Sequence, residues 1–134
     1  MKSIKSFLTS ITLLLSFFTA KAYDYYLGGL YYNKTSDTTV TVTFNDEKGP
    51  EYNIERLQGS IIIPSTICPY GVPYRVTSIG EYAFYSCINI TSIYIPNGVT
   101  SIGSEAFLDC HKLSSITLPE SLTTIDDAAF YNCI

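Results

Sequence analysis

The stretch from Val76 to Ile134 reads VTSIGEYAFYSCINITSIYIPNG (76–98), VTSIGSEAFLDCHKLSSITLPES (99–121) and LTTIDDAAFYNCI (122–134). Each segment repeats the one before it at a shift of 23 residues, and apolar side chains recur at the same positions. The recurring positions are Val76, Val99 and Leu122; Ile79, Ile102 and Ile125; Phe84, Phe107 and Phe130; and Cys87, Cys110 and Cys133. A fixed period of about 20 to 29 residues is typical of a solenoid, whose stacked coils bury a core that one coil cannot bury alone.

Each complete repeat predicts two short strands. One carries the pattern Ile-x-Ile/Leu-Pro, in which Ile93 and Ile95 face the core while Tyr94 faces outward, because side chains alternate along a strand. The other strand reads Val-Thr-Ser-Ile and is followed by Gly80 or Gly103, which permits a tight corner. The segment after the glycine opens with acidic residues, so we expect a single helical or 3₁₀ turn there.

An earlier copy of the first strand stands at residues 60–64, which precede residues 92–96 by 32 positions. The nine surplus residues fall within 66–75, where a Pro-Tyr-Gly centre favours a turn. We therefore expect a small hairpin that projects from the first coil. The predicted fold class is mostly β: a right-handed solenoid of parallel strands with short helical turns.

The repeated pattern Val-Thr-Ser-Ile-Gly-x-x-Ala-Phe-x-x-Cys-x-x-(Leu/Ile)-x-Ser-Ile-x-(Ile/Leu)-Pro resembles the BspA-type leucine-rich repeat. The resemblance covers residues 59–134, and 76–134 most closely. It implies a secreted or surface protein of the kind found in Bacteroides-like bacteria and some protozoa, with adhesion and binding to protein or matrix, and it supplies no catalytic residue. Family members commonly have many repeats, whereas this sequence stops inside its third unit. It therefore predicts a short or truncated member, or association through an open C-terminal end.

Residues 23–58 differ in composition and predict an antiparallel hairpin followed by a polar loop. Val40, Val42 and Phe44 alternate with threonine, which indicates a strand with one buried face. We expect it to pair with residues 29–33 and to cover the end of the solenoid formed by residues 59–134. Five tyrosines crowd the same region, at 23, 25, 26, 31 and 32. They fit two interpretations: packing against the stack, or a platform for sugar rings.

Residues 1–22 predict a secretory signal peptide, because a charged start precedes an apolar run and a small-x-small ending. The apolar run is shorter than the roughly 20 residues of a membrane-spanning helix, and no second long apolar run follows. Cleavage would leave five basic and twelve acidic side chains, a net charge of −7. Such a surface repels phosphate backbones, so we expect no nucleic-acid partner.

The cysteines suggest structure and not chemistry. Cys87, Cys110 and Cys133 occupy one position of successive coils, which separates equivalent side chains by about 4.8 Å, whereas a disulfide needs Cβ atoms about 3.8 Å apart. A row of buried thiols is therefore expected, with Cys68 out of register. His111 follows Cys110, but neighbouring side chains point apart and do not form a nucleophile pair. The sequence predicts no catalytic, cofactor-binding or metal-binding residue, and the redox state of the four cysteines is left open.

The outward positions of the Ile-x-Ile/Leu-Pro strands form the candidate protein-binding face. They are Ser60, Ile62, Ser92, Tyr94, Ser115 and Thr117. The sequence predicts a secreted or cell-surface, non-enzymatic interaction module that binds protein or extracellular matrix through this face, with Ile62 and Tyr94 as anchors. Two alternatives stay open: a carbohydrate-binding module that uses the N-terminal tyrosines, and a non-functional fragment of a longer adhesin.

Overall fold

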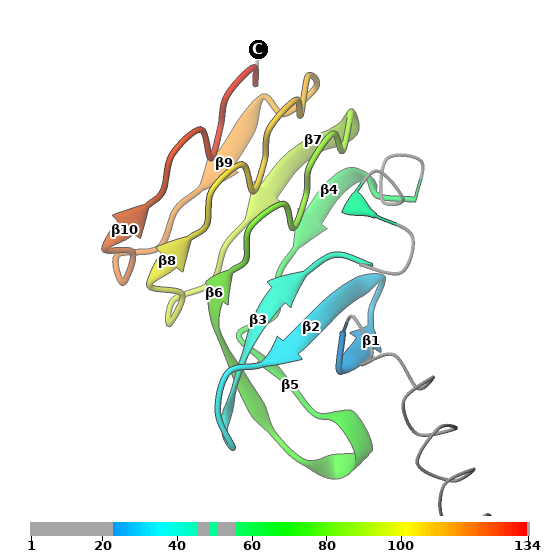
Figure 1. Ribbon diagram of the computed structural model, residues 1–134, viewed down its shortest axis with the longest axis vertical. Coiled ribbons are helices and arrows are strands. Elements are labelled where there is room, and N and C mark those ends of the chain that lie inside the picture. Colours follow the sequence, from blue (N-terminus) through cyan, green and yellow to red (C-terminus); the bar gives the residue numbers. More distant parts are fainter. Residues whose placement is uncertain (1–22, 46–48, 51–55, 134) are drawn as a thin grey trace, which may run out of the picture.

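The computed structural model describes residues 23–45, 49–50 and 56–133. The predicted signal peptide and most of the predicted polar loop lie outside these residues. The strands are β1 (Tyr25–Leu27), β2 (Leu30–Lys34), β3 (Thr39–Thr43), β4 (Gln58–Ile62), β5 (Thr66–Ile67), β6 (Tyr74–Ile79), β7 (Asn89–Tyr94), β8 (Ser101–Ile102), β9 (Ser115–Thr117) and β10 (Thr124–Ile125). Figure 1 shows the coils following one another from the β1–β3 end to the C-terminal end.

Two parallel ladders connect the coils, as the 23-residue period predicts. β4, β7 and β9 form a three-stranded sheet, and β6, β8 and β10 belong to a seven-stranded sheet. In the smaller sheet Ser92 pairs with Ser60 on one side and with Ser115 on the other. In the larger sheet Ile102 pairs with Ile79 and with Ile125. The predicted mostly β solenoid of parallel strands is confirmed, including the offset of 32 residues at its first strand.

The N-terminal hairpin extends the larger sheet. β2 and β3 pair antiparallel, and β3 then pairs in parallel with β6, so that Val40 lies beside Val76 and Val42 beside Ile79. Both valines are fully buried, which explains why valine alternates with threonine in this strand. A third short strand, β1, pairs with β2 through a turn at Gly28 and Gly29 and was not predicted.

The segment between residues 66 and 75 forms the predicted projecting hairpin. β5 pairs antiparallel with the start of β6, with Thr66 opposite Arg75 and Ile67 opposite Tyr74. The 3₁₀ turn η2 (Pro69–Gly71) lies between these strands. After this excursion, β6 pairs with β8 at the 23-residue offset of the repeat, with Ser78 beside Ser101.

The helical turn expected after each glycine corner takes a different form, a run of overlapping turns. Ala83 N–H bonds to Gly80 O within its own coil at 3.3 Å, whereas Phe84 N–H bonds to Ala106 O of the next coil at 2.7 Å. Alternate N–H groups therefore point to the neighbouring coil, and residues such as Tyr82 adopt a positive φ of 56°. Hydrogen bonding between coils prevails over the local helical pattern because these groups would otherwise lie unpaired in the stack.

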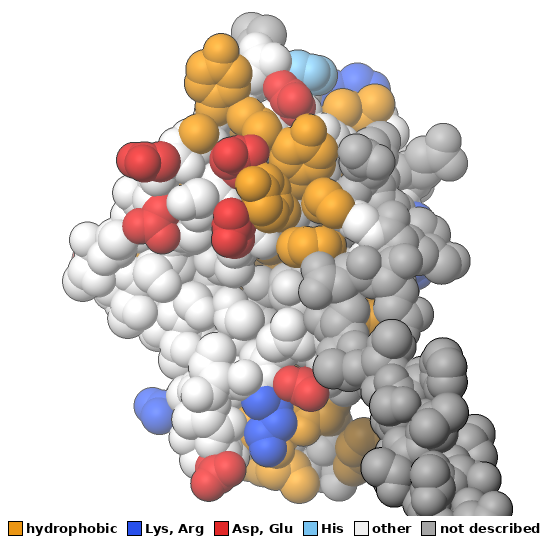
Figure 2. Space-filling model, viewed as in Figure 1, with side chains coloured by type: hydrophobic (Ala, Val, Ile, Leu, Met, Phe, Trp, Pro, Cys, Tyr) orange, Lys and Arg blue, Asp and Glu red, His pale blue; other side chains and the backbone are white. Residues whose placement is uncertain are grey.

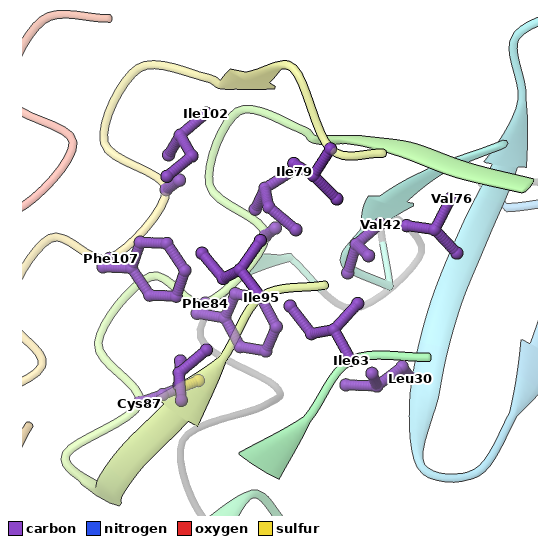
Figure 3. Close-up of a cluster of buried hydrophobic side chains, with 14 of the residues drawn as sticks. Leu30, Val42, Ile63, Val76, Ile79, Phe84, Cys87, Ile95, Ile102 and Phe107 are labelled. Atoms are coloured by element: carbon purple, nitrogen blue, oxygen red, sulfur yellow. The ribbon is translucent and has the colours of Figure 1, made fainter. Parts of the chain in front are cut away.

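The interior of the coils is filled by the recurring apolar positions. Phe84 and Phe107 stack at 5.0 Å with an interplanar angle of 4°, and Phe107 and Phe130 stack at 5.1 Å with an angle of 3°. Figure 3 shows two of these rings in the core with Ile95 and Cys87. Close packing extends to the backbone at Gly103, where an added Cβ would lie 2.7 Å from the amide nitrogen of Glu81 in the preceding coil. The repeated glycine is therefore required by backbone approach and not by a positive φ.

Candidate functional site

The predicted binding face lies on β4, β7 and β9. The first row of outward positions consists of three serines from successive coils, and the Ser92 hydroxyl donates a hydrogen bond to Ser60 Oγ at 2.7 Å. In the second row, Ile62 lies directly opposite Tyr94, and Tyr94 lies opposite Thr117. Exact strand register therefore brings positions far apart in the sequence onto one surface.

A shallow hollow of about 430 Å³ runs across this face, and all six predicted residues line it together with Ile93. Ile62 is 71% exposed and Tyr94 is 47% exposed, so two large apolar side chains stand side by side in solvent. No charged side chain is among the described residues that line the hollow. The surface can thus make apolar contacts and exchange hydrogen bonds through hydroxyl groups, which both donate and accept.

A second hollow, of about 320 Å³, is formed where β1 faces the tip of the projecting hairpin. We call it the tyrosine cleft, and its lining residues are Tyr23, Asp24, Tyr25, Tyr26, Leu27, Pro69 and Tyr70. The sequence drew attention to the N-terminal tyrosines but not to Pro69 and Tyr70. The Pro-Tyr-Gly turn was the available signal, yet nothing local to residues 69–70 indicates that they lie beside β1.

The rings on one side of the tyrosine cleft are fixed by their neighbours. Tyr23 and Tyr26 both contact Tyr31, with ring centroids 4.5 and 4.7 Å apart. Arg56 lies over the Tyr26 ring at 5.1 Å, and its Nη1 donates to the Tyr31 hydroxyl at 2.8 Å. On the other side of β1, a hydrogen bond with Tyr74 raises the pKa of Tyr25 to about 12.

A third and smaller hollow, of about 220 Å³, lies between the two larger ones. It shares Ile62 with the strand face and Leu27 with the tyrosine cleft. These three hollows therefore adjoin one another. Acidic side chains gather in another part of the surface. Figure 2 shows them over the upper coils, beside a group of exposed hydrophobic side chains.

Cys87 and Cys110 lie in the core and Cys133 is half-buried against it, and all three are free thiols. Cys110 Sγ donates to Phe84 O at 3.2 Å, and Cys133 Sγ donates to Phe107 O at 3.1 Å, so each thiol bonds to the backbone of the preceding coil. Burial raises the pKa of Cys110 to about 12, which suppresses the nucleophilic thiolate. Cys68 is exposed.

His111 does not contact the thiol beside it in sequence. The imidazole is exposed and lies 3.1 Å from Asn132 O in the next coil, whereas Cys110 points into the core. Within the described part of the chain, no group of three or more His, Cys, Asp or Glu side chains is placed to hold a metal ion. Likewise, none of the described helices has the length and apolarity to cross a membrane.

Stacked coils with two parallel ladders define a leucine-rich-repeat protein, a class that generally serves in protein interaction. Residues 70–134 match the BspA type leucine rich repeat region in six copies. A leucine-rich repeat protein from Bacteroides capillosus is 34% identical with a TM-score of 0.65, and the match covers 79% of this chain and 72% of that one. The chain belongs to the BspA-type leucine-rich-repeat family.

Two further crystal structures share the fold. A leucine-rich repeat protein from Bacteroides ovatus is 33% identical with a TM-score of 0.70 over 83% of this chain. The T. pallidum leucine rich repeat protein is 28% identical with a TM-score of 0.62 over 77% of this chain. This chain spans 27% and 42% of the length of those two proteins. No curated protein sequence matches it significantly.

Proposed function

We propose that this chain is a secreted or cell-surface, non-enzymatic interaction and adhesion module that binds a protein or matrix ligand through the exposed face of β4, β7 and β9. The observation that carries the proposal is the pairing of Ile62 with Tyr94 on an uncharged strand surface. Their inward neighbours are fixed by the repeat, whereas nothing in the core requires an apolar residue at these two outward positions.

The chemistry of the face suits a protein partner. Tyrosine is enriched at interface hot spots because it combines a large apolar area with a hydroxyl group and few rotatable bonds. Full burial of an aliphatic side chain such as Ile62 is worth about 1.5–3 kcal/mol. The serine row beside these anchors offers hydrogen bonds that adapt to a partner's backbone. An uncharged centre surrounded by polar groups is the usual anatomy of an interface.

The sequence of the N-terminal segment supports the proposal that this face lies outside the cell. Residues 1–22 have the charge and apolar pattern of a signal peptide, and removal of three lysines would leave a net charge of −7. Self-association through the last coil stays a prediction beside this proposal. The mass of the purified protein in solution tests it.

The test captures ligands from solubilised extracellular matrix on immobilised protein. The double variant Ile62→Ser/Tyr94→Ser removes both anchors, and Tyr131→Ser, which changes a tyrosine that is 67% exposed outside this face, is the matched control. We expect a specifically captured protein to be lost from the double variant by at least about tenfold, a free-energy change of about 1.4 kcal/mol, and to be retained by the control. Equal capture by all three proteins would show that the ligand does not bind this face.

A further inference from the structure

Tyr70 adopts a backbone conformation that its own contacts do not explain. It occupies the third position of the turn Cys68–Gly71, which is closed by a hydrogen bond from Gly71 N–H to Cys68 O at 3.3 Å. Its φ is 52° and its ψ is 28°, a left-handed conformation for which such turns favour glycine or asparagine. The side chain is 98% exposed, so no packing against the protein offsets the backbone strain.

The other positive φ angles of non-glycine residues have a structural cause that Tyr70 lacks. They recur at two positions of the repeat, which are Tyr82, Glu105 and Ala128, and Ser86, Asp109 and Asn132. These positions belong to the overlapping turns, where hydrogen bonds between neighbouring coils order the backbone. Tyr70 lies outside the repeat and takes part in no such ladder. Strain of this kind, held by a bulky exposed residue, is characteristic of ligand sites.

The strained turn places Tyr70 and Pro69 opposite β1, where they complete the tyrosine cleft. Among the described strands β1 is at the edge of the sheet and pairs with β2, and the cleft lies along this edge. Four tyrosines line it, and three of these rings are positioned by contacts with Tyr31 or Tyr74. The site is therefore largely ordered before a ligand arrives, which lowers the entropic cost of binding.

A carboxylate is fixed in the same cleft. Asp24 N–H donates to Asn33 Oδ1 at 3.0 Å, and Asp24 Oδ2 accepts a hydrogen bond from Lys34 N–H at 2.7 Å. Both contacts anchor the acid to β2 and orient it beside the phenol rings. No Lys or Arg is among the described residues that line the cleft, and the neighbouring Arg56 donates to the Tyr26 and Tyr31 hydroxyls. The charged group on the described lining is the Asp24 carboxylate, which disfavours a phosphate or another anion.

We propose that the tyrosine cleft binds a neutral saccharide, with Tyr70 as the ring on which one sugar stacks. A pyranose has apolar C–H faces and a rim of hydroxyl groups. The cleft presents matching groups: aromatic faces, phenol hydroxyls that donate and accept, and a carboxylate that accepts from sugar hydroxyls. A purely apolar ligand would desolvate these polar groups without pairing them. The site is independent of the strand face that we propose for protein binding.

The experiment titrates the purified protein with neutral hexasaccharides built from glucose, xylose, mannose or galactose, and follows binding by saturation-transfer NMR. Choline chloride and glucose 6-phosphate serve as cationic and anionic comparison ligands. For such a shallow site we expect a dissociation constant on the order of 1 mM for at least one neutral saccharide. Both charged ligands should bind more weakly than that saccharide.

Variants assign the binding to the cleft. Tyr70→Ala should weaken saccharide binding at least about tenfold, whereas Tyr131→Ala, an exposed tyrosine outside the cleft, should leave it unchanged. Tyr70→Phe keeps the ring and should retain most of the affinity. Because Tyr70 is almost fully exposed, Tyr70→Ala should melt at the same temperature as the wild type. Asp24→Asn should also weaken saccharide binding, which tests the carboxylate separately from the ring.

Three results would overturn the proposal: no binding of any neutral saccharide, an equal loss in Tyr70→Ala and Tyr131→Ala, or preferential binding of choline or the phosphorylated sugar. The variant Ile62→Ser/Tyr94→Ser separates this site from the strand face, since it should keep saccharide binding while losing a protein ligand. Loss of both ligands in that variant would place the saccharide on the strand face and contradict its assignment to the cleft.

Discussion

The row of stacked phenylalanines offers a quantitative test of how the coils hold together. Phe84 and Phe107 are both fully buried, but Phe84 stacks on one ring of the row and Phe107 stacks on two, at 5.0 and 5.1 Å. A change to leucine keeps an apolar side chain in place and costs less than about 1.5 kcal/mol from shape alone. Each lost ring pair adds about 0.5–1.5 kcal/mol.

Phe84→Leu should therefore destabilise the protein by about 0.5–3 kcal/mol, and Phe107→Leu by about 0.5–1.5 kcal/mol more, because it loses a second ring pair. Urea denaturation followed by circular dichroism measures both values. The chain has no tryptophan, so tyrosine fluorescence supplies the second probe for two-state behaviour.

The double variant closes the thermodynamic cycle. Phe84 and Phe107 touch, so their coupling energy should be about 0.5–1.5 kcal/mol, the value of one ring pair. Equal destabilisation by the two single variants, together with a coupling energy below about 0.3 kcal/mol, would refute the reasoning. In that case the recurring phenylalanines would act only as space-filling groups, and the parallel stacking would add nothing to their burial.

Two further predictions concern the thiols. Cys68 should react fastest with an alkylating reagent in the native protein, because it is exposed, whereas Cys133 is half-buried and Cys87 and Cys110 are fully buried. Fast labelling of either fully buried thiol would contradict the packing. Stability should also fall as the pH rises: burial raises the pKa of Cys87 and Cys110, the latter to about 12, whereas an unfolded thiol titrates near about 8.5. The native state then binds more protons than the unfolded state above that pH. The stabilisation is complete below about pH 8.5 and is lost by up to about 1.4 kcal/mol per pH unit for each thiol. Urea titrations between about pH 7.5 and 9.5 measure the unfolding free energy as a function of pH. Its decrease with pH should be less steep for Cys110→Ala than for the wild type, and equal steepness would count against this linkage.

Much of the architecture could be predicted because the information is periodic and local. Alternation along Val40 to Phe44 identified a strand, and the 23-residue spacing of phenylalanine, isoleucine and cysteine identified the coils and their register. The same spacing placed Ile62 beside Tyr94 once the offset of 32 residues was recognised. Whether this surface binds a protein stays a proposal, since periodicity identifies which side chains face outward and not what they contact.

The sequence by itself determined the repeat, the inward and outward sides of its strands, and the placement of Cys87 and Cys110 in the core. Tertiary structure alone decided the features that depend on contacts between distant segments. Inter-coil hydrogen bonds converted the expected helical turns into overlapping turns, because alternate N–H groups find partners only in the next coil. The tyrosine cleft has the same origin. Its walls come from residues 23–27 and 69–70, and only the pairing of β3 with β6 brings the N-terminal hairpin beside the projecting turn that holds Tyr70.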